Sequence, residues 1–159
     1  MPSSDETTAR HLTRAVELAA SAREHGNDPF GALLVTADGT IVEAENTVVT
    51  GSDPTGHAET NLVRLAAARL SPADLATATL YTSTEPCAMC CGAIFWAGIP
   101  TVVYALAETA LNAMLPPESI GLVMELPSRE VFARGGHPTE VIGPVDVPNA
   151  AEVHAGYWA

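Results

Sequence analysis

Short β-prone runs alternate with helix-like runs through the middle of the sequence, and this alternation is the strongest constraint on the fold. Residues 78–83 are typical of a buried strand, 87–97 of a buried helix and 101–105 of a second buried strand. A strand, a helix and a strand in close succession form a βαβ crossover, which pairs the two strands in parallel. The sequence therefore predicts at least one parallel pair.

A hairpin is expected before this unit. Residues 31–36 and 40–46 are β-prone, and the Asp-Gly pair at 38–39 between them is a strong hairpin signal. Helix-like runs at 6–25 and 58–70 can cover the sheet. Because the hairpin is antiparallel and the later strands are parallel, we expect an α/β fold: a three-layer α/β/α sandwich with a mixed central sheet.

The chain beyond about residue 107 is interrupted by prolines and gives weaker signals. Its expected elements are short helices at 118–125 and 129–133, a strand at 140–142 and a terminal helix at 150–157. No repeat or linker divides the sequence, and 159 residues suit one domain. We therefore predict a single domain over 1–159 with a divergent C-terminal segment after about 107.

The charge balance argues against polyanionic partners. Nineteen acidic residues against seven Lys and Arg give a net charge of −12, and such a surface repels phosphate groups. Residues 87–107 are uncharged over about the length of a membrane span, but Gly98 and Pro100 interrupt them. The polar start at 1–10 lacks the features of a signal peptide. We expect a cytoplasmic protein that binds neither nucleic acid nor membrane.

Cysteine and histidine form the pattern that carries chemistry. Cys87 and Cys90 lie one turn apart at a predicted helix start, so their side chains point the same way, and the helix dipole there favours thiolate. His57, at another predicted helix start, offers an imidazole nitrogen. Zinc favours such ligands, and three of them leave a fourth position open for water. We predict a Zn²⁺ site formed by His57, Cys87 and Cys90.

Glu59 follows His57 by two positions, close enough to reach water on the metal without competing for the metal. We expect this carboxylate to take a proton from zinc-bound water, to deliver it to a ring nitrogen of the substrate and then to help protonate the departing amine. The hydroxide meanwhile attacks the amine-bearing carbon. The predicted reaction is hydrolytic deamination with release of ammonia.

The motifs at 57–59 (His-Ala-Glu) and 86–90 (Pro-Cys-Ala-Met-Cys) together match the signature of zinc nucleobase deaminases. Up to about residue 107 the chain resembles the cytidine deaminase-like superfamily, in particular its branch of bacterial guanine deaminases and tRNA adenosine deaminases. The resemblance includes Asp-Pro-Phe-Gly-Ala at 28–32 and Tyr-Thr-Ser-Thr-Glu at 81–85. A redox C-x-x-C pair and a structural zinc site are the alternatives for the cysteines.

The resemblance implies a substrate pocket and a homodimer. Asn46 would hydrogen-bond the base and Phe30 would wall the pocket. The backbone amides of Ala58 and Cys87 would face the reacting centre. Trp96 is assigned to the same pocket. The alternatives are turn capping for Asn46 and core packing for the two aromatic residues.

The expected substrate is a small free nucleobase or related amino-heterocycle that is guanine-like, cytosine-like or an s-triazine. After Tyr104 the chain departs from the guanine deaminase pattern: an acidic Phe-Asp-Asp segment is replaced by residues 106–110 and then by Pro-Pro-Glu at 116–118. We therefore assign substrate choice to the C-terminal segment. Its aromatic tail at 154–158 could close over the pocket or pack as a plain helix.

Two other functions are considered. A tRNA adenosine deaminase would need a basic approach surface, which seven basic residues hardly provide. A non-catalytic zinc or thiol module would have no need of Glu59. Cys91 points about 100° away from Cys90 on the helix and is expected in the core. The remaining histidines are assigned to the surface: His11, His25, His137 and His154.

Overall fold

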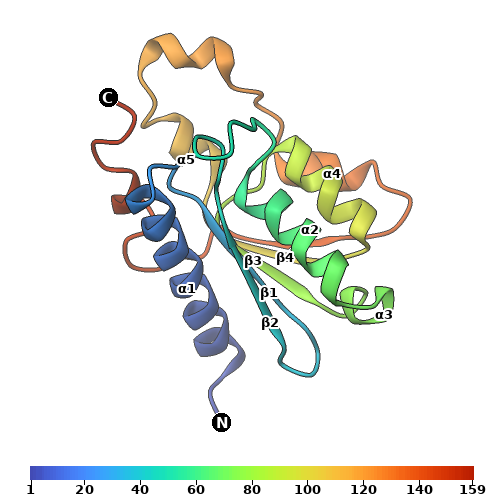
Figure 1. Ribbon diagram of the computed structural model, residues 1–159. Coiled ribbons are helices and arrows are strands. Elements are labelled where there is room, and N and C mark those ends of the chain that lie inside the picture. Colours follow the sequence, from blue (N-terminus) through green and yellow to red (C-terminus); the bar gives the residue numbers. More distant parts are fainter.

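A mixed five-stranded sheet forms the middle of the protein (Figure 1). The computed structural model describes all residues from 1 to 159. The strands are β1 (Gly31–Val35), β2 (Ile41–Glu45), β3 (Thr79–Thr84), β4 (Thr101–Leu106) and β5 (Glu140–Ile142). Their order in the sheet is β2-β1-β3-β4-β5, with β1 antiparallel to both β2 and β3, and with β3, β4 and β5 parallel. The predicted mixed sheet is confirmed.

Helices cover both faces of this sheet. The α-helices are α1 (Ser4–Glu24), α2 (Ala58–Arg69), α3 (Pro72–Leu75), α4 (Ala88–Ala97), α5 (Glu108–Asn112) and α6 (Ser128–Ala133), and the 3₁₀ helices are η1 (Pro117–Leu122) and η2 (Glu152–His154). Helix α1 lies on one face, and α2 and α4 lie side by side on the other (Figure 1). The three-layer α/β/α architecture is therefore confirmed. No helix combines the length and the apolar character needed to cross a membrane.

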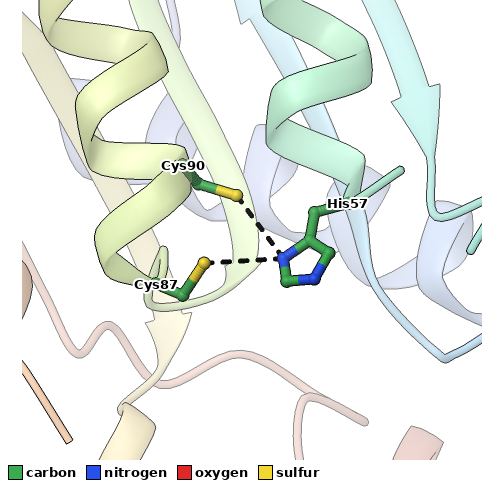
Figure 2. A group of neighbouring side chains, drawn as sticks. All are labelled: His57, Cys87 and Cys90. Carbon is green, nitrogen blue, oxygen red and sulfur yellow. Dashed lines mark hydrogen bonds between the residues drawn. The ribbon is translucent and has the colours of Figure 1, made fainter. Parts of the chain in front are cut away.

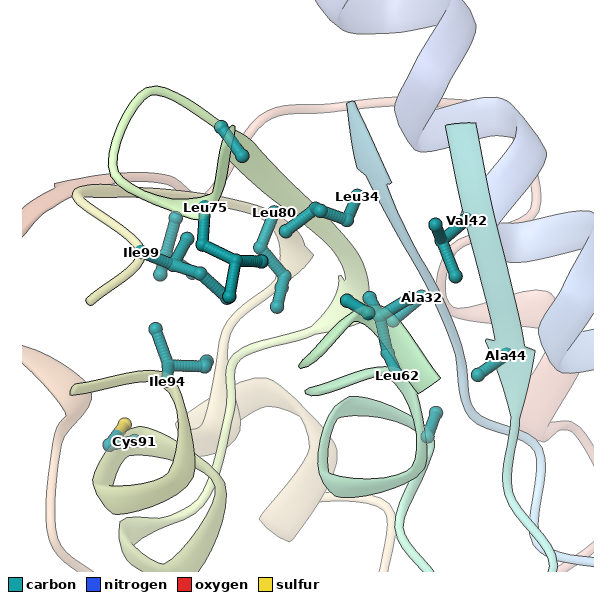
Figure 3. Close-up of a cluster of buried hydrophobic side chains, with 14 of the residues drawn as sticks. Ala32, Leu34, Val42, Ala44, Leu62, Leu75, Leu80, Cys91, Ile94 and Ile99 are labelled. Carbon is teal, nitrogen blue, oxygen red and sulfur yellow. The ribbon is translucent and has the colours of Figure 1, made fainter. Parts of the chain in front are cut away.

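The core consists of two apolar clusters, one on each face. Leu34, Leu62 and Ile94 are fully buried between the sheet and α2 and α4 (Figure 3). Cys91 belongs to this cluster, as expected from its angle on the helix. The other cluster packs α1 against the opposite face, where Leu33 points, because successive strand residues face opposite sides. The C-terminal segment joins this second cluster.

Helix α1 approaches the sheet closely at Gly31. A Cβ atom at this position would lie 2.4 Å from the carbonyl oxygen of Ala15 and 2.5 Å from the backbone nitrogen of Ala19, both in α1. No side chain fits in that space. The glycine therefore sets how closely the first helix packs on β1, the strand that follows Phe30.

The C-terminal segment is less helical than its pattern predicts. Instead of a helix over 150–157, only residues 152–154 form a 3₁₀ turn, and η1 replaces the helix expected at 118–125. Arg23 Nη1 donates to the carbonyl oxygens of Val153 and Ala155 at 2.8 Å each. Gly156, with φ of +69°, then turns the chain. Contacts with α1 thus take the place of helical hydrogen bonds.

Candidate active site

Two helices begin side by side on the same face of the sheet. His57 is the residue before α2 and Cys87 is the residue before α4. Neither side chain caps its own helix, so both are free to bind a ligand. Because α2 packs against α4, the imidazole and the thiol point toward each other (Figure 2).

His57, Cys87 and Cys90 form a compact cluster of metal-binding atoms. The Nδ1 atom of His57 lies 3.5 Å from Cys87 Sγ and 3.6 Å from Cys90 Sγ, and all three ligand atoms lie within 4.8 Å of one another. With Zn–S bonds of about 2.3 Å and Zn–N bonds of about 2.0 Å, tetrahedral coordination places S and N about 3.5 Å apart. The donor set and its spacing therefore fit one zinc ion.

The two thiols of the cluster differ in their affinity for a proton. A hydrogen bond from Cys90, reinforced by His57, lowers the pKa of Cys87 to about 4. The pKa of Cys90 is raised because its proton bonds to Cys87 and because the residue is buried. One thiol of the pair, Cys87, therefore loses its proton readily. The other loses its proton only when a cation is bound, since a bound metal keeps its thiol ligands deprotonated.

Glu59 lies beside this cluster in the first turn of α2 and is only 5% exposed. Thr82, on β3, donates from Oγ1 to Glu59 Oε1 at 2.5 Å, and Cys90 Sγ lies 3.4 Å from Oε2. Burial raises the pKa of the Glu59 carboxyl above its usual value. A carboxyl group of this kind exchanges protons closer to neutral pH, as general acid–base chemistry requires.

A cavity of about 390 Å³ opens over His57, Glu59 and Cys87. Most of its wall is apolar: Phe30, Leu111, Leu115, Leu122, Val123, Met124 and Trp158. Its polar lining also includes Thr84, Glu85, Glu108 and Asn112. Mostly apolar walls with a few polar groups are typical of a site for a small molecule.

The C-terminal tail forms part of this cavity within the same chain. Trp158 lines it, and the Trp158 ring lies 6.0 Å from the Phe30 ring, centre to centre. Tyr157 donates its hydroxyl hydrogen to Asp28 Oδ1 at 2.6 Å. His154 accepts a hydrogen bond at Nδ1 from Trp158 Nε1 at 3.2 Å. The tail is thus fixed at several points next to the site.

The residues assigned to substrate binding have different positions. Phe30 lines the cavity, and Ala58 is buried between His57 and Glu59 at the start of α2, where backbone amides lack helical acceptors. Asn46 is 1% exposed and accepts from the Val48 amide at 3.0 Å, which is a turn-capping bond. Its amide nitrogen bonds to no protein group.

Trp96 does not reach the cavity, which corrects its assignment to the pocket. Its side chain is 86% exposed and contacts Phe95 edge to face. It lies six positions after Cys90 on α4, and this spacing carries it about 240° around the helix. The side chain therefore points away from the metal cluster.

Two histidines assigned to the surface are buried. His11 is 8% exposed and packs on Tyr81, and His154, the first residue of the tail, is 2% exposed. Burial lowers the pKa of both. Their surface assignment was wrong because neighbouring sequence does not reveal contacts made by distant segments.

Several residues of the site were not singled out from the sequence. Glu85 accepts hydrogen bonds from the Glu108 amide and from the amide and hydroxyl of Ser128, and so fastens β3 to α5 and α6. Thr82 and Thr84 are fully or nearly fully buried. The sequence indicates these two threonines only by their spacing: polar residues at alternate positions of a buried strand face the same side of the sheet.

Residues 5–106 match the protein family described as cytidine and deoxycytidylate deaminase zinc-binding region. A probable cytosine deaminase from Schizosaccharomyces pombe is 35% identical over 153 residues, 96% of this chain and 93% of that protein. The guanine deaminase of Bacillus subtilis is 46% identical over 99 residues, 62% of this chain and 64% of that protein. The solved guanine deaminase structure from Nitrosomonas europaea shares the fold, with a TM-score of 0.76 and 24% identity, over 99% of this chain and 85% of that one.

Proposed function

Because this chain belongs to the cytidine and deoxycytidylate deaminase family of zinc-dependent hydrolytic enzymes, we propose that it removes the exocyclic amine of a small free nucleobase or related amino-heterocycle. Guanine-like, cytosine-like and s-triazine rings are the proposed substrates, and ammonia is the second product. The observation that carries this proposal is the placement of Glu59 beside the His57–Cys87–Cys90 cluster in one cavity.

The proposed metal ligands are His57 Nδ1 and the sulfurs of Cys87 and Cys90. Zinc held by these three residues would supply Lewis-acid chemistry that activates water for attack. Once both thiols are ligands, Cys90 carries no proton that could bond either to Cys87 or to Glu59 Oε2. That oxygen is then free for proton transfer, whereas Oε1 stays bonded to Thr82.

Glu59 is the proposed proton shuttle. Its Oε2 accepts a proton from the attacking water and releases it to a ring nitrogen of the substrate, and it then helps to protonate the leaving amine. Burial of this carboxyl raises its pKa and so favours acceptance of the proton. Phe30 and Trp158 restrict the access of bulk water to the ring.

A small free base suits this site better than a nucleic acid. The tail places Trp158 over the cavity, which has a volume of about 390 Å³. The net charge of −12 opposes the approach of an RNA backbone. Both features support the proposal over tRNA editing.

Ammonia release by the zinc-loaded protein tests this proposal. The panel contains guanine, cytosine, adenine, their nucleosides, triazine amines and a tRNA anticodon stem. We expect release from at least one free base and none from the RNA. Release from the RNA alone would overturn the free-base proposal, and no release from any substrate would favour the non-catalytic zinc module.

A further inference from the structure

Glu108 places an unpaired carboxylate in the cavity. It is the first residue of α5, directly beyond β4, and its side chain accepts no hydrogen bond and forms no ion pair, whereas the carboxylate of Glu85 accepts three. Burial, and next the charge of Glu85, raise the pKa of Glu108 to about 7. A half-buried carboxylate without a donor costs free energy. A ligand that donates to it would offset this cost.

Thr84 contributes a second unpaired group to the same cavity. Its side chain is 2% exposed, and its Oγ1 is buried without any hydrogen-bond partner. Buried hydroxyls are normally paired, so this unpaired hydroxyl, on a residue that lines the cavity, is available to a bound molecule. Two independent observations, a lone carboxylate and a lone hydroxyl, therefore point to polar contacts with a bound molecule.

The topology brings these groups to one side of the cavity. Strands β3 and β4 are parallel, and Thr84 pairs in register with Leu106, two residues before Glu108. Both residues thus emerge at the carboxyl ends of neighbouring strands, where α/β sheets bind ligands. Asn112 lies one turn after Glu108 on α5 and also lines the cavity.

We propose that Glu108 and Thr84 recognise a ring edge of the substrate other than the edge that carries the reacting amine, with Glu108 accepting a hydrogen bond from a ring N–H. This inference rests on the proposed function and specifies its substrate class. An ionised carboxylate only accepts hydrogen bonds, so in this form Glu108 selects rings that present an N–H donor. A ring that is alkylated at that nitrogen, or a nucleoside whose sugar is attached to it, lacks this donor and leaves the carboxylate unpaired, which is a strong basis for rejection.

Two variants and a matched control test this inference. Glu108→Gln keeps the shape of the side chain and removes its charge, Thr84→Val removes the hydroxyl, and Glu130→Gln makes the same charge change on the exposed face of α6. Each protein is assayed for kcat/KM with the free base that the wild type deaminates and with the same base methylated at its ring N–H. Zinc content and Tm are measured in parallel.

Glu108→Gln should lower kcat/KM for the free base by about ten- to hundredfold, mainly through KM, since a charge-assisted hydrogen bond is lost. It should leave the methylated base nearly unchanged, so discrimination between the two bases collapses. Thr84→Val should lower kcat/KM by about three- to tenfold without lowering Tm, because the hydroxyl that it removes has no partner in the free protein. If Glu108→Gln lowers kcat/KM equally for the free and the methylated base, or lowers it for neither, the inference is overturned.

Binding without turnover separates this inference from the proposed function. In a Trp96→Phe background, the fluorescence of Trp158 reports base binding in the cavity. Equal binding of the free and methylated bases by the wild type overturns the inference even where ammonia is released. Selective binding without ammonia release from any ring supports recognition by Glu108 and overturns the deaminase proposal.

Discussion

Thr82 orients the carboxyl group on which the proposed proton transfer depends. Its side chain is fully buried, and Oγ1 donates to Glu59 Oε1. We expect Thr82→Val to reduce kcat by about tenfold through loss of this hydrogen bond, with unchanged zinc content. Thr82→Ser should restore most of the rate because it keeps the hydroxyl. Steady-state kinetics and metal analysis of both variants test the prediction, and a wild-type kcat in Thr82→Val would contradict it.

At the scale of residues, local spacing predicts the metal cluster well. Cys87 and Cys90 share a helix start and His57 has its own, so only the contact between two helices was needed to bring them together. Thr84 and Glu108 could not be selected in this way. Whether a threonine in a strand faces a cavity or the core depends on residues from α5 and the tail, which are distant in sequence.

At the scale of elements, periodicity predicts the first two-thirds of the chain closely. Residues 87–107 form α4 and β4, as expected for a buried helix followed by a buried strand. The tail differs because Arg23, on α1, binds its carbonyl groups. A helical pattern cannot reveal a partner more than a hundred residues away.

The tail should also give the protein a stability that depends on pH. Burial lowers the pKa of His154 to about 4 from 6.5. As the pH falls, His154 binds a proton in the unfolded state before it does so in the folded state. Its contribution to the free energy of unfolding is therefore complete above about pH 6.5 and decreases by at most about 3 kcal/mol as the pH falls to about 4. Thermal melts across this range should show Tm falling with pH, and falling less in His154→Phe. Equal slopes in the two proteins would contradict this.

At the scale of the whole molecule, the mixed sheet followed from the sequence but the strand order did not. An Asp-Gly turn identifies the hairpin, and the strand–helix–strand succession identifies parallel pairing. The antiparallel pairing of β1 with β3 could not be predicted in this way, because it depends on packing across the full sheet. Helix α1 lies on one face of the sheet, and α2 and α4, whose starts carry the metal cluster, lie on the other (Figure 1), while Trp158 of the tail reaches the cavity beside that cluster.

The central claim is that Glu59 transfers protons beside a zinc ion held by His57, Cys87 and Cys90. The most direct test compares zinc content and ammonia release in the wild type, in Glu59→Gln and in the control Glu130→Gln. We expect all three to hold zinc equally, and Glu59→Gln alone to lose activity by about 10²- to 10⁴-fold. Zinc-loaded Glu59→Gln that releases ammonia at the wild-type rate would contradict the claim.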